Sequence, residues 1–247
     1  MNVLILTILS IFFNSQDIDS IFKDSNKQYT EGEYQLAVNG YMNIIDLGFE
    51  SAEVYFNLGN SFYKLNNIPE SNYYYEKAIK LLPNDEDIIT NISYAQNLRI
   101  DKIEKLPITQ IQNIKNSLLN IFTQKNWAIL FIILLWCLCI LFILYLISKK
   151  SNYKRVFFSS SIIILVLSSV SLYLNFEKKE LNDIKFGIVF DKEVQVWAEP
   201  NEISELKFLI HEGTKVKKID AIEDWLGIQL ENGTLGWIKS ASVKLLD

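Results

Sequence analysis

Residues that could perform covalent or metal chemistry are few in this chain and lie far apart. Both cysteines, Cys137 and Cys139, fall within one long apolar run, and His211 is the single histidine. Because thiols two positions apart on a helix point to different faces, we expect neither a redox pair nor a zinc site. The phosphate-loop and H-E-x-x-H patterns are also absent. The sequence therefore predicts no catalytic residue, no metal, no cofactor and no enzyme, and His211 is interpreted as a turn residue.

Side chains suited to noncovalent recognition fall within an internal repeat, which aligns 18–51 with 52–85 without gaps. Tyr29 matches Tyr63, and Tyr41 matches Tyr75. The second unit resembles a tetratricopeptide repeat, in which two antiparallel helices pack closely. The signature positions of that family hold Leu58-Gly59, Phe62, Tyr75, Ala78 and Pro83. The first unit is more divergent, with Ser25 where a glycine is usual.

The repeats predict a helical domain over residues 17–106, with a capping helix at 86–100 and about five helices in all. In tetratricopeptide arrays the first helix of each repeat lines the concave groove that binds peptides. Asparagine can pair with an extended peptide backbone, and Phe and Tyr offer apolar contact. The groove residues expected from the alignment are Phe22, Asn26, Phe56, Asn57, Asn60 and Tyr63. The alternative is that these side chains only pack or face solvent.

A membrane hairpin is predicted between the repeats and the C-terminal part. Residues 127–147 and 156–176 contain two long runs without charge, each long enough to cross the ~30 Å hydrocarbon core as a helix. The intervening residues 148–155 carry Lys149, Lys150, Lys154 and Arg155, which predicts a cytoplasmic loop. The hairpin therefore places the chain before it and the chain after it on the same, non-cytoplasmic side of the membrane.

Two further segments accompany this hairpin. Residues 1–16 begin with an uncharged apolar run that resembles a signal peptide, either cleaved or kept as an anchor; a cytosolic start is the third alternative. Residues 107–126 follow a helix-breaking Leu106-Pro107 pair and show apolar residues at helical spacing. This amphipathic segment is expected to lie on the membrane surface, or alternatively to lead directly into the first span.

Residues 181–247 have the alternating pattern of a small all-β domain. Their order of features resembles the bacterial SH3-like barrel, through the elements His211-Glu212-Gly213-Thr214, Asp224-Trp225 and Gly236-Trp237. Trp197 is the candidate contact residue, whereas Trp225 and Trp237 are equally well explained as core. The predicted strands are Phe186–Phe190, Glu193–Ala198, Leu206–Ile210, Lys215–Ala221, Leu226–Leu230, Leu235–Ile238 and Val243–Leu245.

The whole order of segments, with D-K-I-E-x-L-P at Asp101 to Pro107, resembles the BatE family of the Bacteroides aerotolerance operon. The resemblance implies a multidomain, multi-pass protein of the bacterial inner membrane with both terminal domains periplasmic. It implies a protein-protein interaction scaffold linked to stress or aerotolerance. The implied partners are membrane proteins with von Willebrand A domains and, indirectly, a MoxR-type ATPase.

The alternative function is an envelope receptor or sensor whose SH3-like domain binds peptidoglycan peptides. The short predicted cytoplasmic loop leaves no room for an output domain, so we rank this second. The net charge is −5, and the only clustered basic residues lie in the loop, so a nucleic-acid partner is not expected. The expected contacts are protein, the lipid bilayer and, in the alternative, peptidoglycan.

Overall fold

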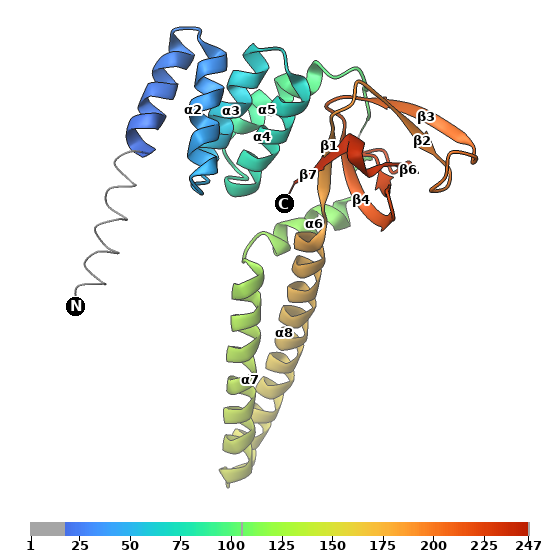
Figure 1. Ribbon diagram of the computed structural model, residues 1–247. Coiled ribbons are helices and arrows are strands. Elements are labelled where there is room, and N and C mark those ends of the chain that lie inside the picture. Colours follow the sequence, from blue (N-terminus) through green and yellow to red (C-terminus); the bar gives the residue numbers. More distant parts are fainter. Residues whose placement is uncertain (1–17, 105, 247) are drawn as a thin grey trace, which may run out of the picture. The chain divides into compact units, whose positions relative to one another are not determined.

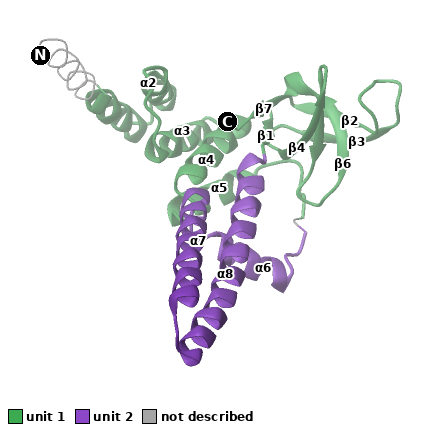
Figure 2. Ribbon diagram, turned by 90° about the horizontal axis from the view of Figure 1, so that it is seen from below, with its two compact units in different colours: residues 1–105, 185–247 green, residues 106–184 purple. Residues whose placement is uncertain are grey.

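The computed structural model describes residues 18–104 and 106–246 of the chain. The predicted signal segment, residues 1–16, lies outside these ranges. The chain divides into two compact units (Figure 2). The first comprises residues up to 105 together with those from 185 onward, and the second comprises residues 106–184. The first unit therefore joins two stretches of chain that are far apart in the sequence.

The N-terminal part of the first unit is an array of helical hairpins (Figure 1). The described residues of this part form five helices, at 18–30, α2 (Tyr34–Asp46), α3 (Ala52–Lys64), α4 (Ile68–Leu81) and α5 (Glu86–Asn97). Helices α2 and α4 begin at equivalent positions of the two repeats, and α5 begins one repeat period after α3. The predicted helical repeat array is confirmed in the described residues.

The turn inside each repeat uses the left-handed backbone region at the same repeat position. Gly32 has φ +86°, and Asn66, its equivalent in the second repeat, has φ +57°. Glycine adopts this conformation freely, and asparagine tolerates it better than most residues. Side chains cap the starts of α3 and α5, since Ser51 accepts a hydrogen bond from Val54 N and Asp85 accepts one from Ile88 N.

Each repeat brings its two helices together at one small residue, but the helix that supplies it differs. In the second repeat, a Cβ added to Gly59 of α3 would lie 2.5 Å from the ring of Tyr75 on α4. In the first repeat the same position holds Ser25, and the small residue is Gly40 on α2, which faces the Ser25 hydroxyl. Ser25 is buried and donates to Ile21 O at 2.7 Å. The divergence of the first repeat is thus compensated from the opposite helix.

The C-terminal part of the first unit is an antiparallel sheet whose strands lie within one residue of the predicted ones. The strands are β1 (Phe186–Val189), β2 (Glu193–Trp197), β3 (Leu206–His211), β4 (Lys215–Ile222), β5 (Trp225–Gln229), β6 (Leu235–Lys239) and β7 (Val243–Leu245), with a 3-10 turn at Ser240–Ser242. Val189, Val196, Ile228 and Ile238 are fully buried at its centre.

The sheet is open, so the predicted closed barrel is not confirmed. Its strand order is β3-β2-β6-β5-β4-β1-β7, which leaves β3 and β7 as edges. Strands β2 and β6 are joined at the single register pair Trp197 and Trp237. With so short a contact between β2 and β6, the β2–β3 hairpin extends from the rest of the sheet (Figure 1).

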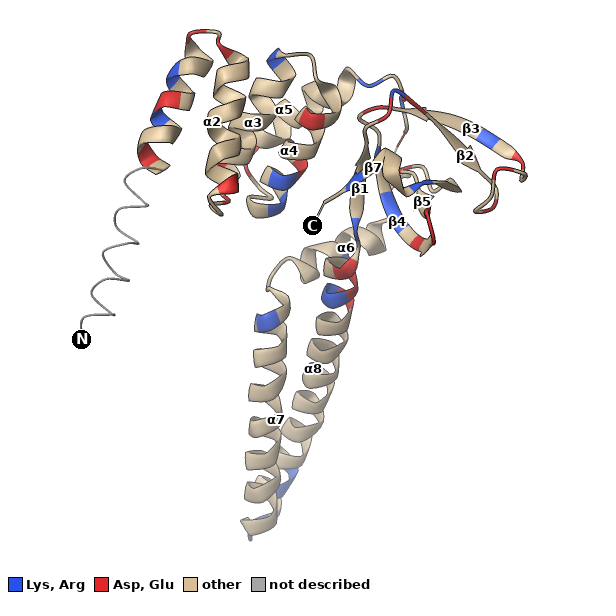
Figure 3. Ribbon diagram, in the orientation of Figure 1, with Lys and Arg blue, Asp and Glu red and all other residues tan. Residues whose placement is uncertain are grey.

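The second unit contains α6 (Gln110–Leu119), α7 (Gln124–Ile147) and α8 (Ser151–Asp183). Helices α7 and α8 are long and apolar enough to cross a membrane, and their middle sections carry no charge (Figure 3). Both are longer than the predicted spans. Only residues 148–150 separate them, so Lys154 and Arg155 belong to α8 rather than to a loop as predicted.

Polar contacts join α8 to the residues around the start of α7. Ser171 Oγ donates to Trp127 O at 3.0 Å, and Asn175 Nδ2 donates to Gln124 O at 2.8 Å. Lys115 of α6 forms an ion pair with Glu177. These contacts hold α6, the start of α7 and the C-terminal half of α8 together.

We predict that Gly59→Ala destabilises the second repeat by about 1–3 kcal/mol, because the buried Tyr75 ring cannot move away from the added methyl group. Hydrogen exchange of α3 and α4 amides in the full chain, held in detergent, measures this loss. The matched control is Ser25→Ala at the equivalent position, where a Cβ is already accommodated. Equal exchange in Gly59→Ala and the unaltered protein would contradict the prediction.

Candidate protein-binding groove

A three-residue hydrogen-bond network joins the helices of the first repeat to the second. Asn26 Oδ1 accepts from the Tyr41 hydroxyl at 2.5 Å and from Asn57 Nδ2 at 3.1 Å. Burial raises the pKa of Tyr41 to about 12, so its hydroxyl stays a donor at physiological pH. The network thus connects the helix over 18–30 with α2 and α3.

The same network recurs at the equivalent positions of the next repeat. Asn60 Oδ1 accepts from the Tyr75 hydroxyl at 2.6 Å and from Asn91 Nδ2 at 2.9 Å. Burial likewise raises the pKa of Tyr75. This second set connects α3 with α4 and α5. A side-chain ladder of Asn, Tyr and Asn therefore runs along the whole array and satisfies polar groups that the tight helix packing would otherwise leave unpaired.

Three residues predicted to bind peptide are members of this ladder. The Oδ1 atoms of Asn26 and Asn60 and the Nδ2 atom of Asn57 are engaged within the protein. The sequence reasoning treated these amides as free for a ligand, because the pairing across helices is not visible in one dimension. That these three asparagines contact a ligand stays a prediction. Such a contact would use the side-chain amide atoms that form none of the ladder hydrogen bonds.

A pocket of about 250 Å³ opens beside the second set, on the side formed by the first helix of each repeat. It contains the predicted residues Asn60 and Tyr63 together. Tyr94 of α5 is 55% exposed at this pocket. The lining residues are Tyr29, Asn60, Tyr63, Lys64, Tyr75, Asn91 and Tyr94. Tyrosine rings, amides and one lysine suit an extended polypeptide better than a small apolar ligand.

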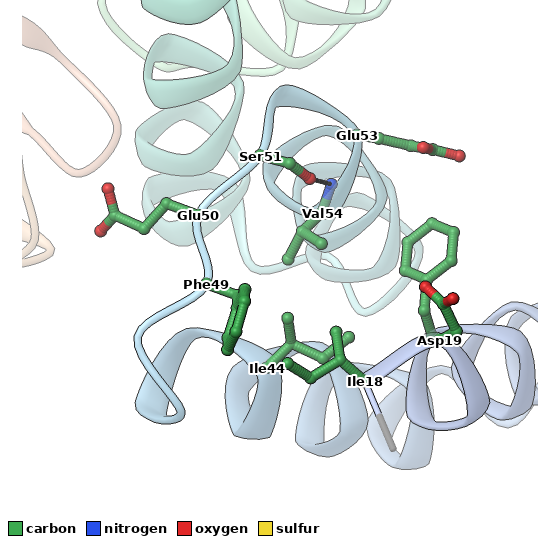
Figure 4. Close-up of a pocket in the computed structure, with 9 residues that line it drawn as sticks. Ile18, Asp19, Ile44, Phe49, Glu50, Ser51, Glu53 and Val54 are labelled. Carbon is green, nitrogen blue, oxygen red and sulfur yellow. Dashed lines mark hydrogen bonds between the residues drawn. The ribbon is translucent and has the colours of Figure 1, made fainter. Parts of the chain in front are cut away.

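The predicted phenylalanines lie in different surroundings. Phe22 lines a second pocket, of about 230 Å³, between the helix over 18–30 and the start of α3 (Figure 4). Phe56 is partly buried and packs against the Tyr75 ring, with centroids 6.0 Å apart. Five of the six groove residues therefore lie in one of the two pockets or in the ladder, and Phe56 belongs to neither.

Trp197 lies on the sheet and belongs to neither helical pocket. It is partly buried opposite Trp237, and it lines a pocket of about 270 Å³ with Glu193, Glu202 and Lys239. Trp225 is a core residue, 7% exposed, with the Lys239 ammonium 4.1 Å from its ring centroid. Trp197 therefore remains the candidate aromatic contact of the sheet.

A carboxylate between the helices and the sheet is the feature that sequence reasoning missed. Asp101 accepts hydrogen bonds from His211 N and Thr214 Oγ1, both at 2.6 Å, and lies 2.8 Å from His211 Nδ1. Burial acts to raise the pKa of Asp101, but the bonds from Thr214 and His211 outweigh burial and hold it below its ordinary value. His211, interpreted from the sequence as a plain turn residue, therefore anchors the sheet to the helical part.

Helix α4 completes this junction with its outer face. Asn72 Nδ2 donates to Gly213 O at 3.1 Å, and Lys215 Nζ pairs with Glu76 Oε2 at 2.6 Å. Gly213 has φ +80°, and an added Cβ would lie 3.1 Å from Asn72, so the turn must be glycine to fit. The available sequence signal was the pair Asn72 and Glu76, whose i, i+4 spacing places two polar side chains on one face of α4.

The tetratricopeptide repeat family model matches residues 52–85. This part of the chain is a tetratricopeptide repeat. The matched segment contains α3 and α4 with Gly59, Tyr75 and Asn60 of the ladder. No curated protein matches the chain. The repeat points to a non-catalytic interaction domain.

The structure brings together no set of residues for metal chemistry in the part it describes. Within residues 18–104 and 106–246, no group of three or more His, Cys, Asp or Glu side chains could hold a metal ion. Cys137 and Cys139 are free thiols of α7. The chemistry available at the candidate groove is noncovalent, through rings, amides and charges.

We predict that Asp101→Ala loosens the junction by about 1–3 kcal/mol, because His211 N and Thr214 Oγ1 lose their acceptor. Since the folded pKa of Asp101 is lowered, its contribution is present at neutral pH and is lost as pH falls through that pKa. At pH 7 the amides of residues 211–216 should therefore exchange faster in the full-length Asp101→Ala variant than in the unaltered protein.

The difference in exchange between Asp101→Ala and the unaltered protein should shrink in acid, at a pH below the ordinary pKa of an aspartate. Asp191→Ala, which removes an exposed carboxylate from the β1–β2 turn, is the matched control and should leave the exchange unchanged. If Asp101→Ala and Asp191→Ala changed the exchange at pH 7 by the same amount, the assignment of Asp101 to the junction would be contradicted.

Proposed function

We propose that this protein is a membrane-anchored scaffold whose helical repeats bind other proteins. The observation that carries the proposal is the tetratricopeptide repeat at 52–85, with an accessible pocket on the side where the first helix of each repeat lies. The opposite face of α4 is covered by the sheet through Asn72 and Glu76. The concave side is therefore the repeat surface left for a partner, with Tyr63, Lys64 and Tyr94 as its contact residues.

The anchor is the pair α7 and α8, which crosses the membrane twice in this proposal. Lys149, Lys150, Lys154 and Arg155 lie where the two helices join, and a basic turn favours the cytoplasmic side. Both ends of the chain then lie on the other side, in the periplasm of a bacterial inner membrane. Helix α6 leaves Ile111 and Ile114 79% and 63% exposed, which suits a helix lying on the membrane surface.

The finer identity of the scaffold comes from the order of its segments. Repeats, two apolar helices and a C-terminal sheet suit the BatE family, in which the sheet is an SH3-like domain. The partners are then membrane proteins with von Willebrand A domains, with a MoxR-type ATPase associated indirectly, in a complex linked to stress or aerotolerance. The sequence and the repeat support a protein partner; the resemblance supports this particular set.

A second candidate function is favoured by the pocket around Trp197. Its rim carries Glu193, Glu202 and Lys239 beside an aromatic ring, a combination that suits a short peptide with both charges. In this alternative the sheet binds peptidoglycan peptides and the protein acts as an envelope receptor or sensor. The two functions differ in which pocket contacts the ligand.

A photo-crosslinking amino acid at Tyr94 in native membranes tests the groove. We expect it to capture a von Willebrand A domain protein, because Tyr94 is exposed at the pocket. The matched control is Leu36 of α2, which is 49% exposed on the outer helix of the first repeat, and it should capture little. Equal capture at both positions would contradict the groove. Capture of cell-wall peptides at Trp197, with none at Tyr94, would favour the second candidate.

Cysteine accessibility tests the topology. In a Cys137→Ser, Cys139→Ser background, a membrane-impermeant maleimide should label Ser240→Cys in spheroplasts. It should label Lys150→Cys only after permeabilisation, because the basic turn is held on the cytoplasmic side. Labelling of Lys150→Cys in intact spheroplasts would overturn this orientation.

A further inference from the structure

The pocket at the start of the repeats has an apolar floor. Ile44 and Val54 are 1% and 5% exposed at its base, and Phe49 is 43% exposed at its edge. Figure 4 shows Ile18, Ile44, Phe49 and Val54 directed toward the same space. This floor, with Phe22 beside it, offers contact to methylene groups over a volume of about 230 Å³.

Three acidic residues lie at the rim of this pocket, and the Glu50 and Glu53 side chains extend outward from it (Figure 4). Glu50 lies on one side, and Asp19 and Glu53 lie on the other (Figure 4). Lys77 pairs with Glu50 at 3.7 Å, and a hydrogen bond from Tyr55, together with that lysine, lowers the pKa of Glu50. In the described ranges no ion pair involves Asp19 or Glu53. The pocket is therefore both apolar and anionic, with two carboxylates that form no ion pair within the described residues.

Few ligand types satisfy both properties. An anion would be repelled by the three carboxylates, and a purely apolar group would remove water from Asp19 and Glu53 without replacing it. Lysine and arginine side chains combine an aliphatic stem with a cationic end, and they bury the stem along apolar surface while the charge stays at the rim. The pocket chemistry matches that kind of side chain.

We propose that this pocket receives a lysine or arginine side chain from an extended segment of the partner protein. The stem lies along Phe22, Ile44 and Val54, and the charged end lies between Asp19 and Glu53. This inference rests on the proposed function, since it assigns the chemistry of the partner that the repeats bind. It also makes the first repeat, and not only the matched second one, part of the binding surface.

The charge distribution of the helical part supports a basic partner. Acidic residues outnumber basic ones between residues 17 and 105. Asp19, Glu53 and Asp87 occupy the same position in three successive repeat units. Each therefore lies near the start of the first helix of its unit. Such a field attracts a cationic segment and increases its rate of association.

Saturation-transfer difference NMR on the full chain in phosphatidylcholine nanodiscs tests the proposal. The probe is the peptide acetyl-Gly-Ala-Lys-Ala-Gly-amide, with norleucine in place of lysine as the matched ligand. We expect the strongest saturation at the lysine methylene groups, a weaker signal for the norleucine peptide, and loss of the difference at high salt.

The variant Asp19→Asn with Glu53→Gln should weaken lysine-peptide binding roughly three- to tenfold, because two exposed charges are removed. Glu33→Gln, an exposed acid outside the pocket, is the control and should have no effect. Equal saturation of both peptides, or binding unaffected by the double variant, would overturn the inference. If partner capture at Tyr94 persists in that case, the scaffold function stands without this pocket.

Discussion

The burial of helix α4 on two sides is the constraint on which the first unit depends. One side packs on α3, where Gly59 admits the Tyr75 ring. The other side is covered by the sheet, through Asn72 and Glu76. Asp101, which follows α5 in the chain, adds hydrogen bonds to His211 and Thr214 of the sheet. Because each side uses specific hydrogen bonds, the sheet cannot turn on α4 without leaving buried polar groups unpaired.

Polar side chains also connect the helices of the repeats. Besides its apolar core, the array contains an Asn–Tyr–Asn set at equivalent positions of each repeat. Asn26 and Asn60 accept two bonds each from neighbouring helices. The ladder fixes the spacing of the helices that carry both helical pockets. A surface built this way is largely pre-formed, and a pre-formed surface has a lower ordering cost for any segment that binds it.

The second unit follows a different physical rule. Helices α7 and α8 carry long uncharged runs, and in lipid only a helix satisfies every backbone N–H and C=O within its own segment. Ser171 and Asn175 use their side chains at one end, where they bond to the backbone near Trp127. The described residues in the middle of this pair carry no charge, which is the composition that a lipid-facing helix requires.

Local patterns by themselves determined much of this protein. The repeat period predicted the helical array and its capping helix, and alternation predicted every strand within one residue, because helix and strand formation depend on nearby side chains and turns. The tertiary structure decided the rest. It paired Asn26 with Asn57, opened the sheet at β3 and β7, and joined Asp101 to His211 across more than a hundred residues. Such contacts depend on which surfaces meet when elements distant in the chain pack together, and no local pattern records that choice.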